Sequence, residues 1–460
     1  MSEVPTFQPQ IEYFDPHYET MPKDQLDALT FERFKREIDH AYETNAFYRR
    51  KFDEHGVTPA DVTNPSETAR LPVSTKAELI ADTDQYPPFG SRHQSDEASP
   101  VLVIETGGSS AQGQEAHPLS ASEIENVYVA EAYGFFWAGA RPGGIVAQTF
   151  PVSLGGAGLF WHGAVHTKIR SGIMHLGNYD TETKLRKMAH YRANVLIATG
   201  PYLRRLEHVA DLEGIRLTTD LGIRSIITLG EGASREWVRT REEMWGARLF
   251  EHYGCTQRAF FGTCEYGMLP EGRRGIVHFL PHMCYVEVVN TDTYRHAQRG
   301  EEGELVITPI GSDASPLIRF KTGDRARFMK AEDCPCGRPF DGVESCSIGR
   351  ADDMIKVKGV NIWQNVIDSV ILAHAEVVEY AGRVFVAEDG KEVARVDVEF
   401  NHSVQTQTRK TLLTTIRAAL ATSTGLGFDV EQWTGSPLLD HHEKSTQRKH
   451  RRWVDERWEN

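Results

Sequence analysis

The chain has 460 residues, of which 40% are apolar and 25% charged, a composition typical of a folded protein with a substantial core and two or more domains. Its formal net charge of −14 argues against general nucleic-acid binding, which needs a cationic surface. The sequence has no apolar run of about 18 residues to cross a bilayer and no apolar signal core at its polar start, so a cytoplasmic protein without a membrane partner is expected.

The predicted elements are first helical and then, from about residue 98, of α/β type. Phe34, Ile38, Ala41 and Tyr42, spaced three and four apart, predict a helix over 25–56. Apolar runs at 101–105, 223–229 and 247–254 each end in a loop of small residues. They predict three buried strands of a sheet with ligands at the strand ends, and further strands are expected at 285–289 and 303–310.

The chain changes character again near residue 350, where we place a domain boundary. Residues 384–400 predict a hairpin around an Asp-Gly turn, and residues 404–424 predict a helix. The apolar face of that helix contains Leu412, Leu413, Ile416 and Leu420, and Gly425 stands just beyond its end.

All six cysteines lie in one fifth of the chain, at positions 255, 264, 284, 334, 336 and 346. Cytoplasmic thiols are normally reduced, so this clustering indicates a metal site rather than disulfides. A reduced cysteine cluster packed in a strand layer is the alternative.

Several motifs, in order along the chain, resemble those of the phenylacetate–CoA ligases in the adenylate-forming superfamily. They are KREIDHAYETNAFYRRKFDEHGV (35–57), LPVSTKAEL (71–79), EHYGCTQ (251–257), PLIRFKTGD (316–324), DCPCGRPF (333–340) and GRADDMIKVKGVNIW (349–363). The resemblance covers nearly the whole chain. It implies an α/β fold with a large multi-sheet adenylation domain over 1–350 and a small, mobile α+β lid domain over 351–460.

The resemblance also implies a nucleotide site. Asp324 matches the acid that binds the ribose hydroxyls, because a short carboxylate accepts two hydrogen bonds from a cis-diol. Arg350 matches a ribose or phosphate contact, Tyr253 a ring beside the adenine, and Gly230 the opposite wall of that slot. The full implied set is Ser109, Ser110, Gly230, Glu231, Tyr253, Gly254, Thr256, Gln257, Asp324 and Arg350.

Two departures from the family pattern affect this site. The loop TGGSSAQGQ (106–114) has Ala111 and Gln112 where the family has glycine and lysine, which removes a positive charge near the pyrophosphate. Gln257 stands where the family has the acid that contacts magnesium, and a neutral amide is a poorer ligand for a hard cation. Local compensation and altered chemistry are both open.

The C-terminal part carries the implied catalytic lysine, which neutralises charge developing at the α-phosphate and carboxylate oxygens. RKHRRWVDER (448–457) points to Lys449, with Lys444 as the alternative. Asp352 matches the family hinge, and Gly359 matches the point where pantetheine passes close to the backbone.

For the metal, the resemblance implies a structural zinc on Cys264, His278, Cys334 and Cys336, since three thiolates and an imidazole form a closed tetrahedral set. Cys284, Cys346 and His282 are reserve ligands. The acyl pocket is assigned to Phe150, Trp161 and His252. An aryl or arylacetic acid fits the family, and a small branched or hydroxylated acid fits if an aromatic ring fills part of the cavity.

The function expected from the resemblance is an AMP-forming acid–CoA ligase that uses ATP, Mg²⁺ and coenzyme A. A carboxylic acid would form an acyl-adenylate, and the thiol of coenzyme A would then displace AMP. The alternatives are an adenylating enzyme that transfers the acyl group to an amine or carrier protein, and a catalytically weakened nucleotide-binding homologue. A homodimer is the habit of the family.

Overall fold

The computed structural model describes residues 9–93, 102–106, 115–153, 155–230, 233–291, 293, 295–312, 314–350, 354–357, 360–387, 391–436, 438 and 452–458. Within these ranges no helix combines the length and the apolar character needed to cross a bilayer. The helices are α1 (Pro16–Glu19), α2 (Lys23–Thr44), α3 (Ala46–Glu54), α4 (Lys76–Gln85), α5 (Ala121–Trp137), α6 (Ala157–Gly163), α7 (Thr181–Tyr191), α8 (Gly200–Leu212), α9 (Leu217–Asp220), α10 (Arg235–Trp245), α11 (Gln364–Ile371) and α12 (Thr406–Thr424).

One large mixed sheet dominates the fold. Its parallel half has the order β4-β3-β5-β6-β7, and its antiparallel half continues as β8-β9-β13-β12-β11-β10, with β14 paired to β12. The strands are β3 (Ile145–Gln148), β4 (Gly172–His175), β5 (Val195–Ile197), β6 (Ser225–Leu229), β7 (Arg248–Cys255), β8 (Ala259–Thr263), β9 (Ile276–His278), β10 (Cys284–Val289), β11 (Glu302–Pro309), β12 (Phe320–Met329), β13 (Gly342–Glu344) and β14 (Gly349–Arg350).

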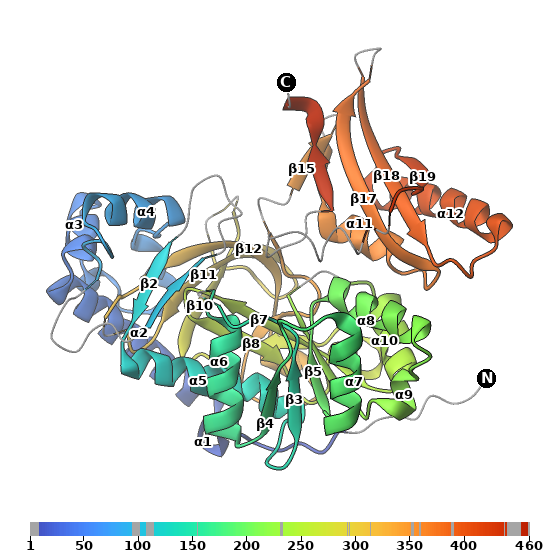
Figure 1. The fold of residues 1–460 in the computed structure, drawn as a ribbon. Coiled ribbons are helices and arrows are strands. Elements are labelled where there is room, and N and C mark those ends of the chain that lie inside the picture. The colour runs from blue at the N-terminus through green and yellow to red at the C-terminus, as the bar shows by residue number, and fades with distance from the viewer. Residues whose placement is uncertain are drawn as a thin grey trace.

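The inner parallel strands β3, β5, β6 and β7 are largely buried, which explains why they read as apolar runs in the sequence, whereas the edge strand β4 is exposed or half-buried. Leu196, Ile226 and Leu249 pack into a core with α7, α8 and α10. Their neighbours Ile197 and Ile227 point the opposite way and pack with α5 and α6. Figure 1 shows these two groups of helices on either side of the strands.

The helix expected over 25–56 is instead two helices, α2 and α3, which meet at Asn45. Asn45 has extended backbone, and its side-chain oxygen accepts a hydrogen bond from the backbone N–H of Tyr48. The same side chain donates to the carbonyl of Arg92 at 2.6 Å. An asparagine that caps one helix ends the preceding one, so the single-helix prediction was wrong at this residue.

The strand expected at 101–105 forms as β1 (Leu102–Glu105), but it does not join the large sheet. It pairs antiparallel with β2 (Ala116–Leu119) in a separate two-stranded ribbon. The strands expected at 223–229 and 247–254 are β6 and β7, which are parallel neighbours in the large sheet. A short apolar run predicts a strand but not its partner, which explains the error.

The C-terminal residues form their own sheets. A small pair, β15 (Met354–Val357) and β16 (Val360–Trp363), is followed by a sheet of order β19-β18-β17-β20. Its strands are β17 (Val377–Val386), β18 (Glu392–Phe400), β19 (Asp429–Gln432) and β20 (Trp453–Asp455), and β17 and β18 are the expected hairpin. The expected helix is α12, which buries Ile416 and Leu420 and ends at left-handed Gly425. Figure 1 shows this body beside α8 and α10.

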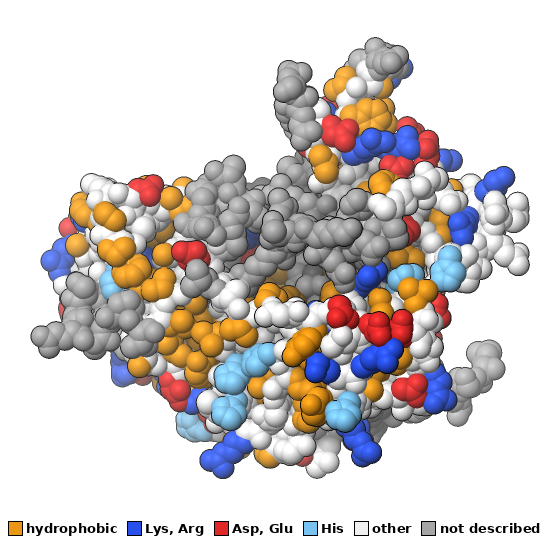
Figure 2. Space-filling model, viewed as in Figure 1, with side chains coloured by type: hydrophobic (Ala, Val, Ile, Leu, Met, Phe, Trp, Pro, Cys, Tyr) orange, Lys and Arg blue, Asp and Glu red, His pale blue; other side chains and the backbone are white. Residues whose placement is uncertain are grey.

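The surface over α6 and β4 carries a group of histidines. His162 Nδ1 lies 3.0 Å from His175 Nε2, and the rings of His162 and His166 are stacked with centroids 5.4 Å apart. Figure 2 shows histidine side chains gathered on this face. These imidazoles are exposed or half-buried, so any metal-binding experiment on the protein has to control for them.

Candidate active site

The carboxyl ends of β6 and β7 bring Gly230 and Tyr253 together. Gly230 follows β6 directly, and its N–H donates to the carbonyl of His252 at 2.8 Å. A Cβ on Gly230 would lie in ordinary contact with the Tyr253 ring at 3.7 Å, so the φ of +26°, and not a lack of space, disfavours a side chain there. Two of the residues expected around the adenine therefore lie in contact, with backbone exposed beside an aromatic ring.

Tyr253, Asp324 and Arg350 form one hydrogen-bonded set from three strands. The Tyr253 hydroxyl donates to Asp324 Oδ2 at 2.7 Å, and Arg350 Nη1 lies 3.3 Å from Asp324 Oδ1. Asp324 and Arg350 are register partners of β12 and β14. Burial and the neighbouring Asp324 carboxylate raise the pKa of Tyr253 well above its usual value, so the phenol remains the donor.

The ring of Tyr253 is packed on one face by Phe261, with centroids 5.5 Å apart and the planes 11° from parallel. Gly254 follows Tyr253 and is exposed at the end of β7. Thr256 lies half-buried in the turn after that strand. Because Phe261 covers one face of the Tyr253 ring, a ligand cannot stack on both faces of Tyr253. The exposed backbone of Gly254 remains open to a ligand.

Gln257 donates from Nε2 to Glu115 Oε2 at 2.6 Å. Glu115 Oε2 also contacts His117 Nε2 at 2.9 Å, and both side chains are buried. Gln257 was expected from the sequence to depart from the family pattern, whereas Glu115 was not among the predicted site residues. The sequence offered one signal for Glu115, namely its position directly after the expected phosphate loop at 106–114.

The three residues assigned to the acyl pocket lie along one aromatic wall. Phe150 and Trp161 meet edge to face with centroids 5.0 Å apart. Phe135 on α5 bridges Trp161 at 6.5 Å and His252 at 5.4 Å. Burial lowers the pKa of His252 to about 4, and its Nε2 has no hydrogen-bond partner among the described residues. This wall presents a neutral imidazole between apolar rings.

Glu131 on α5 is a buried carboxyl that the sequence analysis missed. It accepts a hydrogen bond from Trp161 Nε1 at 3.1 Å. A Cβ on Gly254 would lie 4.0 Å from Glu131 Oε1, so this carboxyl faces the glycine at the end of β7. Burial raises the pKa of Glu131 from 4.5 to about 8, which makes it a neutral hydrogen-bond donor at pH 7.

Replacing Glu131 by glutamine is expected to stabilise the protein at alkaline pH. A pKa raised on folding gives a contribution that is full below pH 4.5 and is lost as the pH rises through about 8. The glutamine cannot ionise, so the variant lacks this loss. Between pH 5 and pH 9 the free energy of unfolding of the wild type should therefore fall by roughly 3 to 5 kcal/mol more than that of the variant. Urea unfolding across this pH range measures the difference. Glu54→Gln, at an exposed position, is the control, and equal pH profiles would show that Glu131 ionises normally.

Four sulfur and nitrogen donors converge next to β9. The ligand atoms of Cys264, His278, Cys334 and Cys336 all lie within 4.8 Å of one another, and all four residues are buried. Cys264 Sγ lies 3.5 Å from Cys334 Sγ, and Cys336 Sγ lies 3.6 Å from His278 Nε2. These separations fit two ligands on one zinc ion with bonds of about 2.0 to 2.3 Å. His278 Nδ1 contacts the carbonyl of Phe340 at 2.8 Å, which leaves Nε2 free for the metal.

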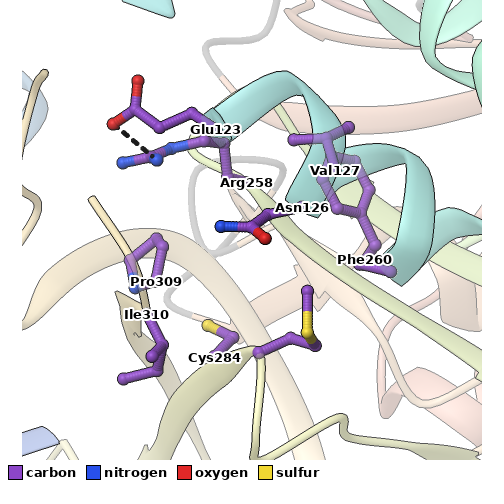
Figure 3. A pocket seen from close by; sticks show the side chains of 10 residues that line it. Glu123, Asn126, Val127, Arg258, Phe260, Cys284, Pro309 and Ile310 are labelled. Carbon is purple, nitrogen blue, oxygen red and sulfur yellow. Dashed lines mark ion pairs between the residues drawn. The ribbon is translucent and has the colours of Figure 1, made fainter. Parts of the chain in front are cut away.

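The reserve ligands lie elsewhere. His282 stacks on Tyr18 with ring centroids 3.9 Å apart, and the backbone N–H of Cys346 donates to Glu251. Cys284 lines a small cavity beside α5, shown in Figure 3, above which Arg258 pairs with Glu123 at 2.9 Å. Its volume of about 20 Å³ suits a single water molecule and is too small for an acyl group.

Several predicted site residues fall outside the described part of the chain. They are Ser109, Ser110, Glu231, Asp352, Gly359, Lys444 and Lys449, together with Ala111 and Gln112 of the expected phosphate loop. Their roles remain predictions.

Comparison with known proteins places this geometry in a class. None of the family models searched matches the chain. The chain is 29% identical over 391 residues to the phenylacetate–coenzyme A ligase of Thermus thermophilus, covering 84% of each chain. It is 25% identical over 357 residues to that of Aromatoleum evansii, covering 77% of each. A 2-hydroxyisobutyryl-CoA ligase structure in the postadenylation state has a TM-score of 0.83 at 22% identity, covering 98% of this chain and 94% of that chain.

The fold is that of the adenylate-forming ligase structures. The large mixed sheet and the smaller C-terminal sheet match the architecture of that class. Within this class the chain is phenylacetate–CoA ligase-like, so the resemblance and the fold class inferred from the sequence are confirmed.

Two structures of the 2-hydroxyisobutyryl-CoA ligase differ in their overall similarity to this chain. The TM-score is 0.83 for the postadenylation state and 0.67 for the thioesterification state, with the same covered share of each chain.

Proposed function

We propose that this chain is an ATP-dependent acid–CoA ligase that forms an acyl-adenylate and then an acyl-CoA thioester. The observation that carries the proposal is the Tyr253–Asp324–Arg350 set beside the open backbone of Gly254, at the carboxyl ends of the parallel strands. Ligands of open α/β sheets bind at this edge. The phenylacetate–CoA ligases that resemble this chain over most of its length support the reaction.

In this proposal Asp324 orients the nucleotide through the ribose hydroxyls. Tyr253 bonds to one oxygen of this carboxylate and Arg350 to the other, so the carboxylate is fixed before the nucleotide arrives. A preoriented acceptor loses little freedom when the ligand binds. Gly254 and Gly230 would let the nucleotide approach the backbone closely.

Residues 351–460 are proposed as a lid domain that carries the catalytic Lys449, with Lys444 as the alternative. The amine would neutralise charge at the α-phosphate while the acid attacks, and the lid would then move to admit the thiol. Structures of the 2-hydroxyisobutyryl-CoA ligase in two states, with different similarity to this chain, support such a movement.

The acid substrate is proposed to be an aryl or arylacetic acid or a small hydroxy acid. The aromatic wall of Phe135, Phe150 and Trp161 favours an apolar body, while neutral Glu131 and His252 add polar groups at its edge. Mg²⁺ is proposed to accompany ATP. A structural Zn²⁺ is proposed on the cluster of Cys264, His278, Cys334 and Cys336, where it would link β9 to the loop that contains Cys334 and Cys336.

Pyrophosphate release measured with ATP and Mg²⁺ over a panel of carboxylic acids, with and without coenzyme A, tests this function. Acid-dependent release followed by thioester and AMP formation only with coenzyme A is the expected result. Asp324→Ala should raise the KM for ATP by about tenfold or more, because it removes a charged hydrogen-bond acceptor. Asp341→Ala, which changes an aspartate outside the nucleotide site, is the control.

Two outcomes would redirect the proposal. Full turnover to AMP without coenzyme A, in the presence of an amine or a carrier protein, would favour a different acceptor. Nucleotide binding without release of pyrophosphate for any acid would favour the weakened homologue.

A further inference from the structure

The contact between Gln257 and Glu115 brings a carboxylate to the place where the sequence lacks one. Gln257 Nε2 donates to Glu115 Oε2 at 2.6 Å across 142 residues of sequence. Because the amide nitrogen is engaged in this bond, the amide oxygen of Gln257 is the end left for another ligand. Among the described residues that oxygen makes no hydrogen bond.

The second oxygen of Glu115 has no hydrogen-bond partner within the described ranges, although it is buried. The whole Glu115 side chain is only 3% exposed. A buried carboxylate oxygen without a partner is unfavourable by several kcal/mol unless an ion or water completes it. The pair therefore offers two oxygens, one charged and one neutral, of which the charged one is incompletely satisfied.

The backbone around Glu115 fixes its position. Glu115 and Thr106 close the β1–β2 hairpin, with the Glu115 N–H donating to Thr106 Oγ1 at 2.9 Å and the Thr106 N–H donating to the Glu115 carbonyl at 3.0 Å. Gln257 lies in the turn directly after β7, next to Gly254. The carboxylate is thus held at the junction of the hairpin and the nucleotide end of the sheet, not on a free surface.

The charges around the pair are mixed. His117 contacts Glu115 Oε2 at 2.9 Å, and Lys76 and Arg92 contribute positive charge to this region. The His117 contact and the bond from Gln257 both engage Oε2, so they leave Oε1 available. An oxygen-lined position with one carboxylate suits Mg²⁺, which binds one or two protein carboxylates and takes its remaining ligands from phosphates and water.

We propose that Glu115 supplies the carboxylate that Gln257 lacks, and that the two side chains together bind the divalent cation of a metal–nucleotide substrate. The proposal rests on the proposed function only for the identity of that nucleotide. It assigns the missing acid to a different position: the charge lies at the loop end of the β1–β2 hairpin instead of in the turn after β7. Glu115 and Gln257 would hold the cation and orient the phosphates, and take no part in bond breaking.

The test measures Mn²⁺ binding by electron paramagnetic resonance, with α,β-methylene-ATP as the nucleotide. Glu115→Gln keeps the size and the hydrogen bond to Gln257 but removes the charge. It should weaken Mn²⁺ binding by about 10 to 100-fold. Gln257→Glu in the same chain moves the carboxylate to the neighbouring position, so the double exchange should recover most of the affinity. Glu105→Gln, on β1 of the same hairpin, is the matched control and should bind as the wild type does.

Two results would overturn the proposal. The first is equal Mn²⁺ affinity in the wild type and Glu115→Gln. The second is a loss that the double exchange fails to restore while the thermal unfolding midpoint drops, which would make Glu115 a structural residue.

Failure of this proposal is distinguishable from failure of the proposed function. Glu115-dependent Mn²⁺ binding without pyrophosphate release for any acid would leave the cation site standing and remove the ligase activity. Acid-dependent pyrophosphate release with the same Mg²⁺ dependence in Glu115→Gln and wild type would support the ligase activity and remove the cation site.

Discussion

Replacing Glu379 by leucine is expected to cost about 3 to 5 kcal/mol of stability, because it leaves buried guanidinium groups without their shared carboxylate. Glu379 on β17 is fully buried. Its Oε2 accepts from Arg204 Nη2 of α8 at 2.7 Å, and its Oε1 accepts from Arg452 Nε at 2.9 Å. Burial alone would raise the pKa of Glu379, but the two arginines outweigh it and hold the pKa well below its usual value.

This ion pair joins the two bodies of the protein. Arg204 also donates to the carbonyl of Val378 at 2.8 Å, so α8 is attached to β17 by both backbone and side chain. Arg452 bonds to Asp368 at 3.2 Å and stands three positions after Lys449. Loss of Glu379 should therefore loosen the end of the segment that contains the proposed catalytic lysine. We expect acid-dependent pyrophosphate release to slow by about tenfold or more, as positioning effects of this size are common.

Urea unfolding and hydrogen exchange of α8 and β17 measure the first effect, and pyrophosphate release measures the second. Arg383→Met is the matched control, since Arg383 lies on the same strand, is 41% exposed, and contacts Asp397 at 3.9 Å and the Phe385 ring at 5.5 Å. The double variant Arg204→Met with Glu379→Leu should be more stable than Glu379→Leu alone. The buried Arg204 charge is then removed, and the remaining guanidinium, that of Arg452, still pairs with Asp368. Unchanged exchange in α8 and β17 after Glu379→Leu would contradict the expectation.

Removing the Zn²⁺ proposed for the Cys264, His278, Cys334 and Cys336 cluster is expected to lower the unfolding midpoint by roughly 5 to 10 °C. A ligand that binds only the folded state adds about 4 kcal/mol to the free energy of unfolding when its free concentration is a thousandfold above Kd. The cluster joins the residue after β8, the end of β9 and the loop after β12, and that loop is far from the other two in sequence. Without the metal, three thiols and an imidazole would remain packed against one another.

Metal content by mass spectrometry and thermal unfolding with and without chelator measure this effect. Cys336→Ser should lose the metal and reproduce the chelated midpoint, while Cys346→Ser, a buried thiol outside the cluster, should keep it. His162→Ala with His175→Ala provides the background in which surface histidines do not contribute to the measured metal. Wild-type protein purified without a stoichiometric metal, and unaffected by chelator, would favour the reduced cysteine cluster.

The local pattern of the sequence predicted most elements well, and its errors have a common cause. The buried strands β6, β7, β10 and β11 and the helix α12 were predicted because apolar periodicity is a property of neighbouring residues. Asn45 ended α2 because its side chain bonds to Tyr48 and to Arg92, and the latter lies 47 residues away. β1 left the large sheet because pairing depends on partners that periodicity does not name.

In the candidate site, too, the sequence identified some residues and missed others. The ordered motifs identified Tyr253, Asp324 and Arg350, and the structure joins them by hydrogen bonds across three strands. The four donors of the Cys–His cluster were also identified, because the family motifs place cysteine and histidine at these positions, and the structure brings the four ligand atoms within 4.8 Å of one another. Glu131 was missed because one acid among many on a helix has no signal until its burial is known.

The sequence by itself determined the class of protein, the order of its strands and helices in outline, and the residue types available to the nucleotide and metal sites. It also showed that Gln257 lacks a charge. Only the tertiary structure decided what stands beside that amide, because Glu115 reaches it from 142 residues away through the closure of the β1–β2 hairpin. The same holds for Arg204 and Glu379, whose 175-residue separation disappears when β17 packs on α8. Pairings of this kind depend on how complete elements pack, and a linear pattern carries no record of that.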